Sequence, residues 1–347
     1  MLRKLVFALI ALTAGLCLAE GGVRVWSVFF FPKMIRFDEE LGWRRRPDTQ
    51  KAFVNEWHEE SLVVANRYGN RGVAHPPERK PNTYRVLVLG DSFGEGAQVN
   101  EADLFSAQLE ASETGLEVIN ASVVAYGNVQ EYLYLRDEGL SFQPDLVLVL
   151  VFHNDFSDNI LPYNLRMGPR PYAVLEASGT RIVEEIDDDR FAPFRIPFPF
   201  SAFLYRHSYL FYALNDRVYF GMRDKELAKL DRANMDRVPW ADRQRVLTDM
   251  LGRMKDLVAA NGVELALFLI PSKEEVAAKA SANQDEVTRW CAENNVDCIR
   301  GLEPMCRAAA EGRRPYFDVD IHWTKAGHDV AAAEIRKFLR MKRRQPQ

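Results

Sequence analysis

The sequence lacks the features that mark nucleic-acid, dinucleotide and zinc binding. Its 347 residues carry 45 lysines and arginines against 49 aspartates and glutamates, so the net charge of −4 provides no basic surface for nucleic acid. There are only four cysteines, without the spacing of a zinc site, and two of the three beyond residue 290 can pair outside the cytoplasm. Neither a G-x-G-x-x-G pattern nor a P-loop Lys-Ser/Thr pair is present. We therefore expect no nucleic-acid partner and no cofactor.

Long apolar runs are scarce too, and the first one stands at the N-terminus. Arg3 and Lys4 precede residues 5–19, which carry no charge, and this is the pattern of a secretory signal. The apolar character resumes over 21–32, where Trp26 suits a membrane interface. We favour a signal anchor over residues 1–32 that holds the catalytic domain at the membrane, outside the cytoplasm (periplasmic). Cleavage after Ala19 is the alternative, and it would give a secreted protein.

From residue 84 onward, apolar segments of strand length alternate with helical segments. Strands are predicted over 84–89, 116–120, 144–152, 263–271 and 296–299, and helices over 100–112, with Asn100 as its N-cap, 128–140, 242–262 and 325–342. Strands that are apolar throughout and separated by helices predict a parallel sheet covered on both faces, which is an α/β fold of the three-layer α/β/α type. We divide the chain into a lead-in over 33–82, a catalytic domain over 83–341 and a tail over 342–347.

Polar residues follow the predicted strands at the points where the strands end. The first strand leads into "GDSFGEG" with Ser92, the second into "NASVVAYGN" with Gly127, and the third into "FHNDFSDN" with Asn154. Before the last helix stands "FDVDIHW", which holds Asp320 and His322. In open parallel sheets the carboxyl ends of the strands form the functional edge, so we expect these five residues to meet there.

Two chemistries compete for this set of residues. The aspartates and histidines loosely resemble the clusters of two-metal phosphoesterases, but those begin with the Asp-x-His segment, which comes last here. A nucleophilic serine accounts for more of the set. Ser92 needs a base, His322 can serve as that base, and Asp320, two residues before it, can orient the imidazole. The N–H groups of Ser92 and Gly127 and the amide of Asn154 can receive the oxyanion. We therefore predict a serine-dependent site without metal.

These segments resemble the four blocks of the SGNH (GDSL-type) hydrolases. The blocks are "GDSF" with Ser92, "NASVVAYG" with Gly127, "HND" with Asn154 and "DIHW" with His322, and the resemblance covers about residues 83–341. It implies a flavodoxin-like five-stranded parallel sheet in the order 2-1-3-4-5, ester chemistry on serine and no metal. The third block usually has a glycine that is absent here, and many members place the acid three residues before histidine, where this chain has Val319. The Asp-x-His-Trp form is similar to SGNH proteins of polysaccharide O-acetylation.

The expected function is hydrolysis of small acyl esters, acetyl above all, on an envelope or extracellular carbohydrate. A polysaccharide O-acetyltransferase is the alternative among enzymes, and a catalytically inactive glycan-binding or scaffold protein is the alternative from another class. An insertion at about 160–240 is dense in aromatic residues and proline over 191–214. It is expected to be a lid packed on the core, or the border of an acyl or glycan pocket, or an element that dips into the membrane surface. His207 within it is expected to be structural.

Overall fold

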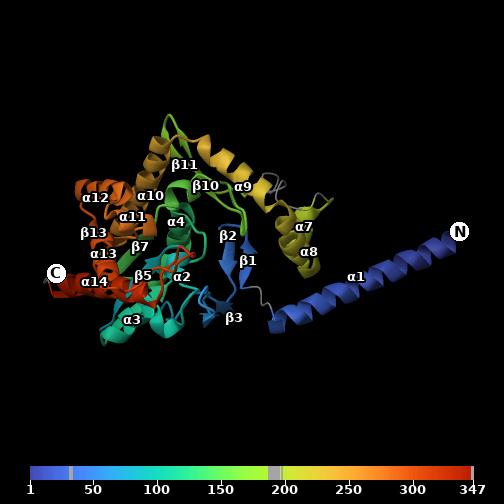
Figure 1. Ribbon diagram of the computed structural model, residues 1–347, viewed down its shortest axis with the longest axis horizontal. Helices are drawn as coiled ribbons and strands as arrows, with labels where there is room; N and C mark the ends of the chain where they lie inside the picture. Colours follow the sequence, from blue (N-terminus) through green and yellow to red (C-terminus); the bar gives the residue numbers. More distant parts are fainter. Residues whose placement is uncertain (31–33, 187–195, 197, 345–347) are drawn as a thin grey trace.

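A five-stranded parallel sheet forms the centre of the computed structural model, which describes residues 1–30, 34–186, 196 and 198–344 (Figure 1). The spatial order of the strands is β13-β12-β7-β5-β6, which read from β6 is the order 2-1-3-4-5 along the chain. The five predicted strands and their parallel pairing are therefore confirmed. They are β5 (Tyr84–Leu89), β6 (Leu116–Asn120), β7 (Leu146–Val151), β12 (Glu264–Leu269) and β13 (Asp297–Arg300).

Helices cover both faces of this sheet, because successive strand residues point to opposite faces and both sets are apolar. Leu87, Val149 and Leu267 lie in one buried cluster with side chains of α4 (Asn128–Asp137), α10 (Trp240–Ala260) and α12 (Ala282–Asn294). Val88 and Leu148 lie in the other cluster, with side chains of α3 (Phe105–Ser112), α13 (Leu302–Ala310) and α14 (Lys325–Arg344). The predicted three-layer α/β/α sandwich is confirmed.

The lead-in forms two antiparallel hairpins, β1 (Ile35–Asp38) with β2 (Gly42–Arg45) and β3 (Thr49–Val54) with β4 (Glu60–Ala65). Two buried arginines attach it to the ends of the sheet strands. Arg45 donates to the carbonyl of Ser122 at 2.8 Å and pairs with the Glu95 carboxylate at 3.0 Å. Arg71 donates to the carbonyls of Glu95, Gly96 and Val99, the last at 2.7 Å. The lead-in thus packs directly on the edge of the sheet where the predicted site residues lie.

The insertion between β7 and β12 consists of two parts with different surroundings. Its first part holds the hairpins β8 (Tyr163–Asn164) with β9 (Gly168–Pro169) and β10 (Tyr172–Glu176) with β11 (Gly179–Val183), and β10 packs on α4 and α10. Its second part, α7 (Ser201–His207), α8 (Tyr209–Leu214), the π-helical turn η4 (Asn215–Tyr219) and α9 (Phe220–Asp236), leads to α10. The first part lies over the core, as a lid was expected to do, and the second part reaches the core through Met235 near the end of α9.

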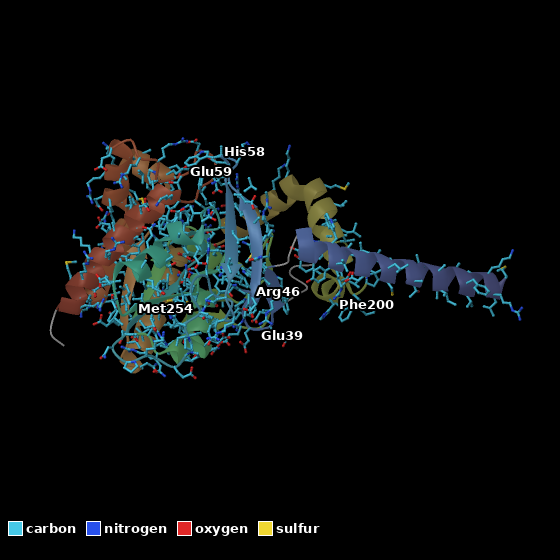
Figure 2. All side chains as sticks on the ribbon, turned by 90° about the horizontal axis from the view of Figure 1, so that it is seen from below. Glu39, Arg46, His58, Glu59, Phe200 and Met254 are labelled. Atoms are coloured by element: carbon cyan, nitrogen blue, oxygen red, sulfur yellow. The ribbon has the colours of Figure 1, made fainter. Side chains whose placement is uncertain are left out.

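The N-terminal helix α1 (Leu2–Phe30) extends away from the sheet and contacts α8 (Figure 1). Figure 2 shows Phe200, which directly precedes α7, on this side of the molecule, whereas Met254 of α10 lies in the body. Residues Leu2–Trp26 are long and apolar enough to cross a membrane, and the described part of the chain holds one such helix. Parts of our expectations lie outside the described residues: the end of the anchor at 31–33, part of the aromatic stretch (191–195 and 197), and most of the tail (345–347).

Shorter elements complete the fold: α2 (Ser92–Glu95), the 3-10 turns η1 (Glu101–Asp103) and η2 (Gly139–Phe142), α5 (Asp155–Asp158) and α11 (Lys273–Ala278). Two local predictions were wrong. The helix expected over 128–140 ends at Asp137, and the one over 100–112 begins with η1, so α3 starts only at Phe105. Asn100 makes no side-chain cap, because its side-chain amide oxygen accepts the N–H of Leu62, a residue of β4, at 3.1 Å. All four cysteines are free thiols in this structure.

Candidate active site

The loop after β5 places Ser92 at the first position of the short helix α2. Asp91 caps this turn by accepting the N–H of Phe93 at 2.9 Å, and Gly96 ends it in the left-handed conformation at φ 56°. A Cβ on Gly94 would stand 2.1 Å from the hydroxyl of Ser122, which follows β6. Glycine is therefore needed for close packing of this turn on the neighbouring strand exit. The N–H of Ser92 is among the first of a helix, and such groups have no acceptor within the helix.

Ser92, His322 and Asp320 form a continuous hydrogen-bonded chain. The Nε2 atom of His322 lies 2.7 Å from the Ser92 hydroxyl, and its Nδ1 atom lies 2.5 Å from Oδ1 of Asp320. The same oxygen also accepts the His322 N–H at 3.0 Å, and Gln98 donates to the second oxygen at 3.3 Å. With Nδ1 donating to the carboxylate, Nε2 is the nitrogen that accepts from serine. This is the arrangement in which an imidazole removes a hydroxyl proton.

The environment of Asp320 keeps it ionised. Burial alone would raise its pKa, but the hydrogen bonds from His322 and Gln98 outweigh burial and hold the pKa at about 2. The carboxylate can therefore stabilise an imidazolium at any pH near neutrality. The side chains of His322 and Asp320 are 18% and 28% exposed, so a substrate can approach them from the surface.

Asp318 is not in a position to perform this role. Its carboxylate pairs with Arg314, and both side chains are more than half exposed. This ion pair holds the pKa of Asp318 below its ordinary value. The geometry therefore favours Asp320 over Asp318 as the partner of His322.

Asn154 lies at the end of β7 with its amide held between two carboxylates. Its Nδ2 donates to Asp91 at 2.9 Å and to Asp158 at 2.8 Å. Asp158 has a second partner, because Arg170 donates to it at 2.6 Å, whereas Asp91 is buried with a raised pKa. Donation to an oxyanion thus requires Asn154 to release one carboxylate, and either carboxylate keeps another donor, Arg170 for Asp158 and the N–H of Phe93 for Asp91.

Gly127 directly precedes α4, at a position that leaves little room for a side chain. A Cβ at this position would stand 3.0 Å from the side-chain oxygen of Asn159 and 3.1 Å from Asp158. The missing side chain therefore makes room for α5 and its C-terminal residue rather than for a substrate. The N–H of Gly127 donates to the side chain of Gln130 at 3.3 Å. An oxyanion would have to displace this long hydrogen bond, so the role of Gly127 stays a prediction.

Two buried acids near the Asp91 carboxylate were not anticipated from the sequence. Glu131 in α4 accepts from Asn128 at 3.0 Å, and Asp155 in α5 accepts the N–H of Phe152 at 2.8 Å. Burial raises the pKa of Glu131 to about 8, and burial together with the neighbouring Glu131 raises the pKa of Asp155 well above its usual value. Glu131 stands in the first turn of α4 and Asp155 at the first position of α5, and no sequence pattern distinguishes such acids from exposed ones.

The candidate residues meet at one edge of the sheet: Ser92 follows β5, Gly127 follows β6, Asn154 follows β7, and His322 lies in the loop between α13 and α14. The sheet has the order 2-1-3-4-5 expected from the resemblance. The fold is that of the SGNH hydrolases. This assignment rests on the strand order and on the placement of the four blocks on the sheet.

Comparisons with known proteins find distant likenesses among solved structures. No protein-family model matches the chain, and no curated protein matches it. Among solved structures, a member of the lipolytic G-D-S-L family from Veillonella parvula is 11% identical, with 76% of this chain and 100% of that chain covered and a TM-score of 0.42. The lipase/acylhydrolase from Enterococcus faecalis is 14% identical, with 75% and 97% covered and a TM-score of 0.40. An acetyl xylan esterase is 11% identical, with 74% and 99% covered and a TM-score of 0.43. Likenesses at this level identify no substrate.

Proposed function

We propose that this chain is a serine esterase of the SGNH type that removes small acyl groups, chiefly acetyl, from a carbohydrate alcohol. The observation that carries this proposal is the hydrogen-bonded chain from Ser92 through His322 to Asp320 at the edge of the sheet. An unactivated serine hydroxyl is a weak nucleophile, and a histidine within hydrogen-bond reach that is itself oriented by a carboxylate is what activates it. A purely structural or glycan-binding protein has no need of this arrangement.

The reaction follows from the positions of these groups. Ser92 attacks the acyl carbon while His322 takes its proton, and Asp320 stabilises the imidazolium that forms. The oxyanion receives the N–H of Ser92, the amide of Asn154 after its release from one of its two carboxylates, and the N–H of Gly127. His322 then protonates the departing alcohol, which leaves an acyl-serine. Water activated by the same histidine hydrolyses the acyl-serine, and the free enzyme returns.

A polysaccharide O-acetyltransferase is the second candidate, and the Asp320-x-His322-Trp323 sequence favours it. Both reactions share the acyl-serine and differ in whether water or a sugar hydroxyl resolves it. The carbohydrate substrate is supported by the export signal, by this sequence form and by the aromatic insertion. The same aromatic residues would also suit a groove for a fatty-acyl chain, so a lipase-like esterase is the remaining alternative.

The deciding assay compares aryl acetate with aryl octanoate, each with and without an oligosaccharide acceptor. Acetate hydrolysis that is indifferent to the acceptor supports the esterase, and an acetylated sugar product supports the transferase. A marked preference for octanoate with no acetate turnover contradicts the small-acyl proposal. Labelling of Ser92 by a fluorophosphonate, with Ser92→Ala as the control, tests serine dependence directly.

We also propose that α1 is retained as a membrane anchor with the catalytic domain outside the cytoplasm. Glu20 of α1 accepts the N–H groups of Tyr209 and Leu210 at 2.9 and 3.0 Å and the hydroxyl of Ser208 at 2.8 Å. Cleavage after Ala19 would leave Glu20 at a free chain end and remove residues 2–19 of α1. A C-terminal reporter that is active only outside the cytoplasm, together with full-length protein in the membrane fraction, is the expected result. Full-length protein in the soluble fraction contradicts the anchor.

A further inference from the structure

The loop that carries Asp320 has little packing of its own. Val319 in its middle is 85% exposed, and Asp318 is exposed as well. Phe317 at its start is buried and packs on Trp57, with 4.7 Å between the ring centroids. Residues 318–320 therefore have almost no apolar contact that would fix their position. Because Asp320 must stand within hydrogen-bond reach of His322, something else has to hold this backbone.

The backbone N–H groups of the loop converge on one carboxylate, that of Glu56. It accepts from Asp318, from Val319 at 2.9 Å and from Asp320 at 2.8 Å. Glu56 belongs to the turn between β3 and β4, at whose tip Figure 2 labels His58 and Glu59. Asn55 shapes this turn by accepting the N–H groups of Trp57 and Glu59, both at 3.0 Å. A charged acceptor of three successive amides is a stronger restraint than a neutral one.

The backbone carbonyls of the same loop converge on one ammonium group, that of Lys273. Its Nζ lies 3.2 Å from the carbonyl oxygen of Phe317, 3.1 Å from that of Asp318, 3.4 Å from that of Val319 and 3.1 Å from that of Asp320. Lys273 is the first residue of α11, which follows β12. The loop is thus held from two sides, its donors by an anion and its acceptors by a cation.

The geometry points to Glu56 and Lys273 as positioning residues that set the catalytic acid. Their side chains bond to the backbone of residues 317–320, and they act on the reaction through Asp320. The inference rests on the proposed function for its kinetic consequence. In this inference the lead-in hairpin β3–β4 helps to form the active site, although Glu56 is 262 residues from Asp318 in the sequence.

The experiment uses the full chain with Glu56→Gln and Lys273→Met, and with Glu60→Gln and Lys279→Met as controls. Glu60 begins β4 and Lys279 follows α11, and both are exposed. The glutamine keeps the size of Glu56 but replaces one acceptor oxygen by a donor, so at least one loop amide loses its partner. We expect kcat for aryl acetate to fall about 10- to 100-fold, because displacement of a catalytic group by about 1 Å has this effect. KM and the unfolding midpoint should stay near the wild-type values, and the controls should be unaffected.

A double-mutant test separates positioning from a general structural role. In the Asp320→Asn background the acid is already lost, so Glu56→Gln should lower the residual rate no further. An equal loss in both backgrounds, or wild-type kcat in Glu56→Gln and Lys273→Met, overturns the inference.

A second readout does not depend on activity. Amide exchange at residues 318–320 should be about tenfold faster in Glu56→Gln than in Glu60→Gln, because a hydrogen bond to a charged group is lost. If the wild-type chain hydrolyses no ester and Ser92 is not labelled, the proposed function fails and exchange alone decides on the restraint. Unchanged exchange then overturns the role of Glu56.

Discussion

Replacing Asp320 by asparagine, with Asp318→Asn as the matched variant, tests the assignment of the acid most directly. Asp320 accepts from His322 Nδ1 at 2.5 Å and from the His322 N–H at 3.0 Å. Asparagine keeps the size of the side chain but carries no charge, so the imidazolium loses its counter-ion and the ring loses the partner that fixes its tautomer. In serine–histidine–acid triads this exchange lowers kcat by about 10⁴-fold, or about 5 kcal/mol of barrier.

The matched variant should behave very differently. The carboxylate of Asp318 pairs with Arg314, and the two side chains are 64% and 55% exposed. Exposed ion pairs contribute little, so we expect Asp318→Asn to change kcat less than about fivefold. Initial rates on aryl acetate, with thermal unfolding of each variant, measure both effects. The assignment is refuted if Asp318→Asn is the severely impaired variant while Asp320→Asn retains near-normal turnover.

Three further predictions concern the rest of the site. Ser92→Ala and His322→Ala should each abolish ester hydrolysis at an unchanged unfolding midpoint, since loss of a triad member lowers kcat about 10⁴-fold or more. Near-normal activity in either variant would contradict the nucleophile mechanism. Asn154→Ala should lower kcat by about 10²- to 10³-fold, as loss of one oxyanion donor does, and a change confined to KM would argue against this role. Burial raises the pKa of Glu131 from 4.5 to about 8, so the folded chain binds more protons than the unfolded chain between these values and its stability falls as the pH rises through them. Urea unfolding at pH 5 and pH 8 should show a smaller decline for Glu131→Gln than for the wild type, and equal declines would contradict the raised pKa.

The sheet could be predicted because its signal is local. Each strand is an apolar run that is buried on both faces, as in "LVLVLV" of β7, and no tertiary contact competes with that pattern. The pairing of Asp320 with His322 could be predicted for the same reason, because both residues lie in one short loop. The resemblance to a known family then supplied the order of the strands.

The parts that the sequence did not predict depend on distant contacts. Asparagine is favoured at helix N-caps, but the side chain of Asn100 instead accepts a hydrogen bond from Leu62 in a strand of the lead-in. Glu56 stands in a turn and Lys273 at the first position of α11, and their partners are backbone atoms 262 to 264 and 44 to 47 residues away. Nearly every residue has the same backbone groups, so no sequence motif indicates which of them a distant side chain contacts. The two carboxylates on the Asn154 amide were missed because they become neighbours only when β5 and α5 meet.

The two buried arginines of the lead-in have a consequence for the order of folding. Arg71 is 1% exposed and Arg45 is 3% exposed, and burial lowers the pKa of Arg71 to about 10. A guanidinium that leaves water needs all its acceptors in place, and these come from loops that exist only after the sheet has formed. We therefore expect the lead-in to dock last, because its contacts span the sheet and are costly to close early. During refolding, the circular-dichroism signal of the helices should therefore return before ester hydrolysis does. Docking of the hairpin β3–β4, which holds the acid loop, is the step between the two.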